Sequence, residues 1–141
     1  MKMSRPSAFI RIPKERIGVL VGVEGKVKRE IEEKLMVDLQ IESDACGVTI
    51  TLSEKATDPS LLLRAKDVVT AIGRGFSPER AFRLLENPDN IFDLIDLRAI
   101  FGRSESDIHR VKSRIIGAEG KTRRTIEELT DASIVVYGHT E

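Results

Sequence analysis

The sequence predicts an α+β fold built from two copies of one β-α-α-β-β-α unit, with the second copy incomplete at its C-terminal end. Residues 22–33 and 117–128 align without a gap at an offset of 95 residues, and eight of the twelve positions are identical. Each repeat begins with a Gly-x-x-Gly turn between two segments of helical periodicity. Because such a repeat is typical of duplicated structural units, we expect two small domains, at residues 1–86 and 91–141.

The first copy begins with a strand at residues 8–13, where apolar residues alternate up to a proline. A short helix is expected at Lys14–Val21, and it ends at Gly22 because glycine takes a positive φ angle without steric cost. A second helix, Lys26–Leu35, carries an apolar residue at every fourth position on one face.

Two further strands and a long helix complete the first copy. Alternating apolar residues predict strands at residues 37–41 and 48–52. Asp58 is expected to cap the following helix, with Pro59 at its first position. This helix should end at the glycines of residues 73–75.

A short connection joins the two copies. Ser77 is expected to cap a helix that begins at Pro78 and runs to about Glu86. The connection is too short for a flexible linker, so we expect the two halves to pack against each other, with Phe82 and Leu85 as candidates for that contact.

The second copy repeats only part of the pattern. We expect a strand at 91–97, a helix capped by Ser104 or Ser106 that runs to Ile116, a helix at Lys121–Thr130 and a strand at 133–137. The last strand and helix of the first copy have no counterpart.

An incomplete sheet leaves one apolar face without cover. Either the sequence is a piece of a longer protein, or something else covers that face. We expect apolar side chains around Ile134 and Val136 to be exposed or to be buried against another chain.

The two turns are the candidate binding sites, for phosphates. Each places the free N–H groups of a following helix beside glycines that allow close approach and beside basic side chains. The candidate residues are Gly22, Val23, Glu24, Gly25, Lys26, Lys28, Arg29, Arg110, Arg114, Gly117, Ala118, Glu119, Gly120, Lys121, Arg123 and Arg124.

Charge favours the second turn. Residues 110–124 contain six basic residues and one acid, whereas the matched window 15–29 contains four basic residues and two acids. The alternative is a plain turn between two helices with solvated charges.

Bulk composition excludes several classes. Lys and Arg (23) balance Asp and Glu (23), so any attraction to nucleic acid must be local. We expect no membrane span, no signal peptide, no cofactor or metal, and a cytoplasmic protein whose single Cys46 is incidental or buried. Gly120-Lys121-Thr122 lacks the preceding glycine and strand of a nucleotide-binding loop, and neither His109 nor His139 has a catalytic partner, so no enzyme is indicated.

The order of elements around Ile-Ile-Gly-x-x-Gly resembles the type I KH domain, an RNA-binding module, in two tandem copies. More specifically, residues 72–85 (IGRGFSPERAFRLL) and 114–128 (RIIGAEGKTRRTIEE) are similar to archaeal tandem-KH ribosome-assembly factors, the counterparts of the eukaryotic partner-of-Nob and Krr-type KH proteins.

The resemblance implies a non-enzymatic factor that binds single-stranded small-subunit ribosomal RNA near its 3′ end during rRNA processing. It also implies work alongside a Nob-type endonuclease and the alpha subunit of translation initiation factor two; DNA is not expected. Two departures stand out: Lys28 and Arg123 occupy a position that is usually apolar, and Glu24 and Glu119 stand in turns where one residue is usually basic. The alternative is a protein-interaction scaffold that recruits an endonuclease or initiation factor with little RNA contact.

Overall fold

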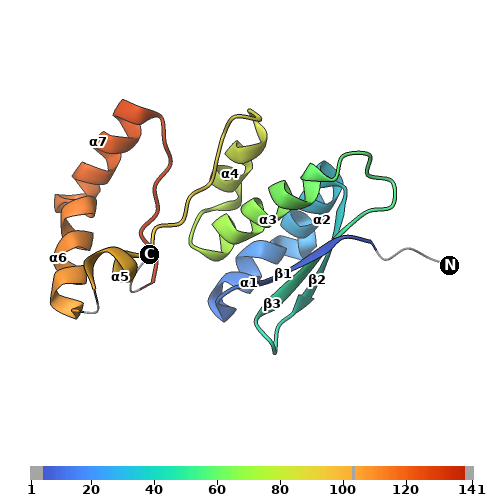
Figure 1. The fold of residues 1–141 in the computed structure, drawn as a ribbon, viewed down its shortest axis with the longest axis horizontal. Helices are drawn as coiled ribbons and strands as arrows, with labels where there is room; N and C mark the ends of the chain where they lie inside the picture. The colour runs from blue at the N-terminus through green and yellow to red at the C-terminus, as the bar shows by residue number, and fades with distance from the viewer. Residues whose placement is uncertain (1–4, 103, 139–141) are drawn as a thin grey trace. The chain divides into compact units, whose positions relative to one another are not determined.

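The computed structural model describes residues 5–102 and 104–138. The chain divides after Phe92 into two compact units, and each is described by itself (Figure 1). The elements in chain order are β1 (Ser7–Arg11), α1 (Lys14–Val21), η1 (Val23–Gly25), α2 (Lys26–Leu35), β2 (Val37–Glu42), β3 (Gly47–Leu52), α3 (Ser60–Gly73), α4 (Pro78–Ala81), η2 (Phe82–Leu85), α5 (Leu97–Phe101), α6 (Glu105–Ile116), η3 (Ala118–Gly120) and α7 (Lys121–Thr130).

The first unit is a three-stranded antiparallel sheet covered on one face by α1, α2 and α3 (Figure 1). The strand order is β1-β3-β2, so β3 pairs with both neighbours. Side chains alternate between the two faces, and the inward ones form the core with the helices. The largest fully buried side chains of this unit are Leu20, Ile31, Leu35, Ile50, Ile72, Val37, Val48, Val68 and Val69.

Every element predicted for the first copy is present, with small shifts at its ends. The two helices that flank the turn have the predicted bounds, because a glycine ends the first and begins the second. The long helix starts one residue later than predicted, at Ser60, since Pro59 occupies the cap position. The Asp58 carboxylate still accepts hydrogen bonds from the backbone N–H and hydroxyl of Ser60, at 2.9 and 2.7 Å.

The connection between the two copies packs on the first unit. Ser77 caps α4 as expected, by accepting a hydrogen bond from the Arg80 N–H. Phe82 and Leu85, the candidates for a contact between the halves, pack against the core of the first unit. Both side chains lie beside Leu61 of α3, which also packs against this core.

The second unit contains α5, α6 and α7 but none of the strands predicted for its described residues. Residues 91–96 are irregular, and Leu97 begins α5 after Asp96 caps it by accepting a hydrogen bond from the Arg98 N–H at 2.9 Å. The apolar residues of this stretch do not alternate, so a helix start competes successfully with a strand. In contrast, Ser104 caps α6 as predicted, through the Asp107 N–H.

Residues 133–137 also form no strand. The equivalent β2 is a strand because β3 pairs with its whole length, and no counterpart of β3 exists among the described residues of the second unit. The segment is nevertheless held in the same place relative to its helix. Glu127 Oε2 accepts a hydrogen bond from the Ile134 N–H at 2.9 Å, as Glu32 Oε2 does from the Leu39 N–H at 3.0 Å.

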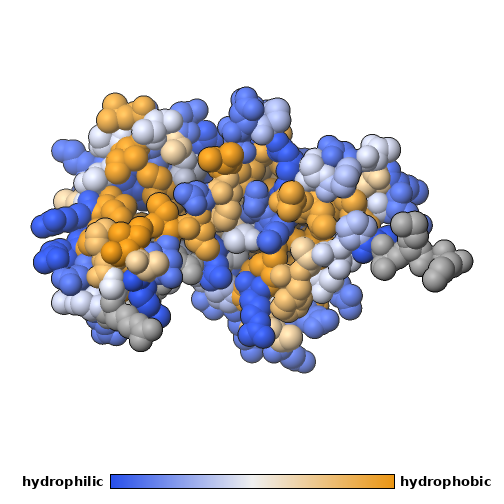
Figure 2. Space-filling model, in the orientation of Figure 1, coloured by the Kyte–Doolittle hydropathy of each residue, from blue (hydrophilic) through white to orange (hydrophobic). Residues whose placement is uncertain are grey.

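The exposed apolar surface of the second unit lies beside the predicted residues rather than on them. Ile134 and Val136 are half-buried. Ile126, however, is 37% exposed, whereas its repeat equivalent Ile31 is fully buried, and Leu129 is 81% exposed. Figure 2 shows hydrophobic atoms gathered on the visible face of this unit, at the left. The second unit therefore buries its helices less completely than the first.

Candidate nucleic-acid interface

The two Gly-x-x-Gly turns have the same backbone conformation. Gly22 has φ and ψ of 75° and 175°, and Gly117 has 74° and 177°. Glu24 follows at 54° and 27°, and Glu119 at 53° and 30°. The last glycine of each turn is left-handed and donates its N–H to the carbonyl of the first at 3.2 Å. The sequence repeat is thus a repeat of local geometry.

The first glycine of each turn is required by close packing. A Cβ atom on Gly22 would collide with Val27, and one on Gly117 would collide with Thr122, both in the first turn of the helix that follows. Both glycines also have positive φ angles, which L side chains rarely adopt. The glycines therefore bring the two helices of each pair together at a sharp corner.

The open side of each corner faces the start of α2 or α7. The first N–H group of each helix, from Lys26 or Lys121, donates to the carbonyl of Val23 or Ala118. The next two N–H groups have no acceptor within the helix, and no side chain of the cap residue accepts from them in either copy. A Cβ atom on Gly25 or Gly120 would meet only arginine side chains, with the nearest guanidinium nitrogen, from Arg29 or Arg124, at 3.6 or 3.2 Å. Open N–H groups beside a cation suit an anionic ligand.

Several basic residues from the two charge windows are engaged elsewhere in the fold. Arg16 Nε and Nη2 donate hydrogen bonds to the carbonyls of Ile72 and Phe76, both at 2.9 Å. These bonds tie Arg16 to the C-terminal end of α3 and to the segment that follows it. Arg110 pairs with Asp107 at 2.9 Å, and Lys112 Nζ donates to the Gly138 carbonyl at 2.6 Å.

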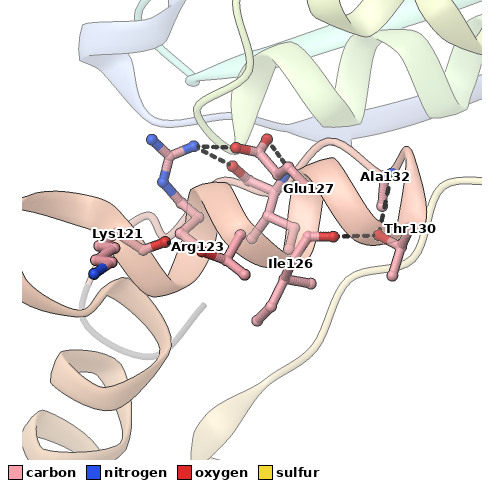
Figure 3. Close-up of polar contacts among 8 residues, drawn as sticks. Lys121, Arg123, Ile126, Glu127, Thr130 and Ala132 are labelled. Carbon is pink, nitrogen blue, oxygen red and sulfur yellow. Dashed lines mark hydrogen bonds and ion pairs between the residues drawn. The ribbon is translucent and has the colours of Figure 1, made fainter.

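The unusual basic residues after each turn have a structural role. Arg123 Nη1 lies 2.9 Å from Glu127 Oε1 and 3.3 Å from the Ile134 carbonyl, as Figure 3 shows in part. Lys28 pairs with Glu32 at 3.4 Å in the first unit. Each basic residue is half-buried and forms part of the link between its helix and the following segment. Their place among the RNA-binding residues stays a prediction, while their contacts within the fold are a structural role that was not predicted from the sequence.

The cations that remain exposed at the turns are few. In the first unit they are Lys26 and Arg29, and in the second Lys121 and Arg124 stand at the equivalent positions. None of these four makes an ion pair within the described ranges. Arg114, exposed on α6, is the one addition in the second unit, where the first unit has Val19 packed against its core. The second turn therefore has one more exposed basic side chain than the first.

The remaining predicted residues lie at the turns themselves. Val23 is 84% exposed at the first turn, and Ala118 is exposed at the second. His109 is exposed on α6, and His139 lies outside the described residues. The part of the chain that the structure describes holds no group of three or more metal-binding side chains and no helix long and apolar enough to cross a membrane.

The sequence predicted the two turns but not the ion pairs and hydrogen bonds that several of the basic residues form within the fold. The Lys28–Glu32 and Arg123–Glu127 spacings of i and i+4 were visible in the sequence and are the usual signal for a helical ion pair. The bonds from Arg16 to the end of α3 span 56 and 60 residues, and no local pattern signals them.

Two family models match the chain. The first unit matches the model described as the Krr1 KH1 domain over residues 7–87. Residues 91–140 match the model of the second KH domain of PNO1, described as a eukaryotic type KH-domain of type I.

Curated relatives extend the match across both units. A KH domain-containing protein of Methanocaldococcus jannaschii is 46% identical over 132 residues, which cover 94% of this chain and 57% of the relative. The pre-rRNA-processing protein PNO1 of Candida albicans is 26% identical over 136 residues, covering 96% of this chain and 49% of the relative. The chain thus spans about half the length of the curated relatives it matches.

Solved structures are similar in fold and sequence. Dim2p of Pyrococcus horikoshii OT3 is 44% identical, with a TM-score of 0.87 over 96% of this chain and 78% of that one. The same values of identity and TM-score hold for a chain in the a/eIF2alpha–aDim2p–rRNA complex from that organism, of which 73% is covered. A protein of Aeropyrum pernix with no stated function is 38% identical, with a TM-score of 0.89 over 96% of this chain and 71% of that one.

Proposed function

Because the chain belongs to the KH-domain family, as a tandem-KH relative of archaeal Dim2p and eukaryotic PNO1, we propose that it binds single-stranded RNA through its two Gly-x-x-Gly turns during ribosome biogenesis. The observation that carries the proposal is the repeated geometry of the turns. Two corners with the same backbone each combine uncapped helix N–H groups with two exposed cations.

The chemistry of the turn suits a sugar-phosphate backbone. Phosphate oxygens accept hydrogen bonds from the second and third N–H groups of α2 and α7, and the positive end of each helix dipole favours their charge. Lys121 and Arg124 add cationic contacts at the second turn, as Lys26 and Arg29 do at the first. Because the turn binds the backbone, the bases of a single strand stay free to contact other side chains.

The second turn is the stronger site in this proposal. Arg114 stands three residues before Gly117, on the exposed face of the helix that leads into the turn. Its equivalent in the first unit, Val19, contributes packing and no charge. One additional exposed cation strengthens phosphate binding without changing the turn itself.

The identity of the RNA and of the protein partners is proposed from the similarity to a solved complex. A similar chain occurs in a complex of a/eIF2alpha, aDim2p and rRNA, which supports ribosomal RNA and the initiation factor's alpha subunit as partners of this chain. Within that frame we propose that the bound RNA lies near the 3′ end of the small-subunit rRNA. Cooperation with a Nob-type endonuclease completes the proposal, with this protein as the non-catalytic RNA-binding member.

The experiment is a comparison of matched turn variants. Fluorescence anisotropy measures the affinity of the full chain for a short single-stranded RNA from the small-subunit 3′ end. Gly120→Asp should abolish most binding, because a carboxylate then faces the phosphates at a position where a Cβ atom meets only flexible arginine side chains, and Gly25→Asp should cost less. Circular dichroism melts control for folding. Unchanged affinity of a folded second-turn variant would contradict the proposal.

A protein-docking role for the first unit is the second candidate, favoured by one groove. The groove has a volume of about 530 Å³ and lies between α2, α3 and η2, with a floor of Leu35, Leu61, Phe82 and Leu85 and a rim of Lys34, Arg64 and Glu86. If this role is the main one, Leu61→Glu should disrupt capture of the initiation factor's alpha subunit in the presence of RNase, and RNA affinity should stay the same.

A further inference from the structure

Both turns place a glutamate at a backbone position that suits it poorly. Glu24 and Glu119 have φ angles of 54° and 53°, in the left-handed region that glycine, asparagine and aspartate prefer. Such outliers occur often at functional sites, where the local strain is retained for a purpose. That the same residue is held in the same conformation in both copies argues against an accident of one turn.

Neither glutamate contributes to the fold. Both side chains are exposed, and neither carboxylate accepts a hydrogen bond or forms an ion pair among the described residues. The contrast with Glu32 and Glu127 is direct, since those carboxylates each accept a backbone N–H and pair with a basic side chain. The turn glutamates are therefore available to a ligand.

The chemistry of a carboxylate restricts what it can bind on a nucleic-acid backbone. An ionised carboxylate only accepts hydrogen bonds. Phosphate oxygens are also acceptors, and they repel it. The one hydrogen-bond donor on the backbone of RNA is the ribose 2′-hydroxyl, and the backbone of DNA has none.

We propose that Glu119, and by repeat Glu24, accepts a hydrogen bond from a ribose 2′-hydroxyl and so makes the turn selective for RNA over DNA. This inference rests on the proposed function, because it assigns a role within the same site. The flanking cations, Lys121 and Arg124, bind the phosphates, while the glutamate accepts a hydrogen bond from the ribose between them. On DNA the same carboxylate meets phosphate without a compensating donor, and binding weakens.

The test compares RNA and DNA of identical base sequence, with uracil in both. Anisotropy measures both dissociation constants for the wild-type full chain and for Glu119→Ala. The matched control is Glu128→Ala, which removes one exposed negative charge from the same α7 helix. The DNA-to-RNA ratio of dissociation constants should fall about tenfold in Glu119→Ala, the effect of one hydrogen bond to a charged group, and should not change in Glu128→Ala.

A second measurement separates the sugar from the base and from bound cations. RNA strands with one deoxyribose at successive positions should reveal a position that weakens the wild type and leaves Glu119→Ala unaffected. Loss that follows a base change instead, an equal gain of both ligands in Glu119→Ala, or a preference that disappears in EDTA would overturn the inference. If the wild type binds no RNA, the proposed function fails with it; if RNA binds and the ratio is unchanged, this inference alone fails.

Discussion

The Oε1 atom of Glu127 lies 2.9 Å from Nη1 of Arg123, and its Oε2 atom accepts the Ile134 N–H at the same distance. One carboxylate thus joins α7 both to its own first turn and to the segment that follows it (Figure 3). Because the same link occurs at Glu32 in the first unit, it is a property of the repeated fold rather than of a ligand site.

Arg123 should therefore affect stability more than binding. Arg123→Met keeps the stem of the side chain and removes the ion pair, so the free energy of unfolding should fall by about 1 kcal/mol, the usual value for a partly buried charged hydrogen bond. RNA affinity should change little. Urea titration and anisotropy on the same variant measure the two quantities.

Arg124→Met is the matched control for Arg123→Met. It removes an exposed cation on the neighbouring position, so it should weaken RNA binding and lower the salt slope of log K by about 0.7, one phosphate contact. If Arg123→Met changes the salt slope as much as Arg124→Met does, Arg123 belongs to the binding site.

Arg114 should account for the difference between the two turns. Arg114→Val should lower RNA affinity and remove about 0.7 from the salt slope, since the site then resembles the first turn. The control is Lys112→Met on the same helix, whose amino group already donates to the Gly138 carbonyl. Equal losses in the two variants, measured by anisotropy at several salt concentrations, would count against a specific role for Arg114.

Two glycines four residues apart should respond to alanine in opposite directions. Gly18 lies inside α1 with open space around its Cβ position, so Gly18→Ala should stabilise the first unit by about 0.5–1 kcal/mol. Gly22→Ala places a methyl group against Val27 at a positive φ angle, and it should destabilise by more than about 1 kcal/mol. Thermal melts decide this, and a stabilising Gly22→Ala would show that the corner is looser than described.

The repeat also predicts unequal costs of truncating equivalent isoleucines. Ile31 is fully buried, so Ile31→Ala should cost roughly 2–5 kcal/mol. Ile126 is 37% exposed, and Ile126→Ala should cost about 1 kcal/mol or less because much of its surface already meets solvent. Denaturant titrations provide both values; similar costs would mean that Ile126 is covered in solution.

The start of α3 should depend on pH. The Ser60 hydroxyl and N–H, which donate to the Asp58 carboxylate, lower the pKa of this group below its usual value. A carboxyl with a lowered folded-state pKa stabilises the fold at pH values above its unfolded pKa, and this contribution is lost as pH falls through the folded pKa. Asp58→Ala should thus lower the melting temperature at pH 7, and the difference from wild type should begin to shrink as pH falls below about 4, the pKa of a free aspartate. A difference that persists unchanged at low pH would contradict this role.

Local signals were sufficient for the helices that flank the two turns, although α5 was missed. The bounds of α1 and α2 followed from glycines and from apolar spacing, because both features act within a few residues. Strands depend on a partner, and the segments at 91–97 and 133–137 had the composition of strands without a neighbour to pair with. The turn residues of the candidate site were likewise predictable. The sequence did not predict which basic side chains face solvent, because the hydrogen-bond partners of Arg16 lie far along the chain.

The most direct measurement of the central claim is an NMR titration of the ¹⁵N-labelled chain with the single-stranded RNA. The largest shifts should appear at the backbone amides of Thr122 and Arg123, followed by those of Val27 and Lys28, because these N–H groups in the first turns of α7 and α2 have no acceptor within the helix. Shifts confined to the groove around Phe82, or no shift at either turn while RNA is bound, would contradict the assignment of the turns as the RNA site.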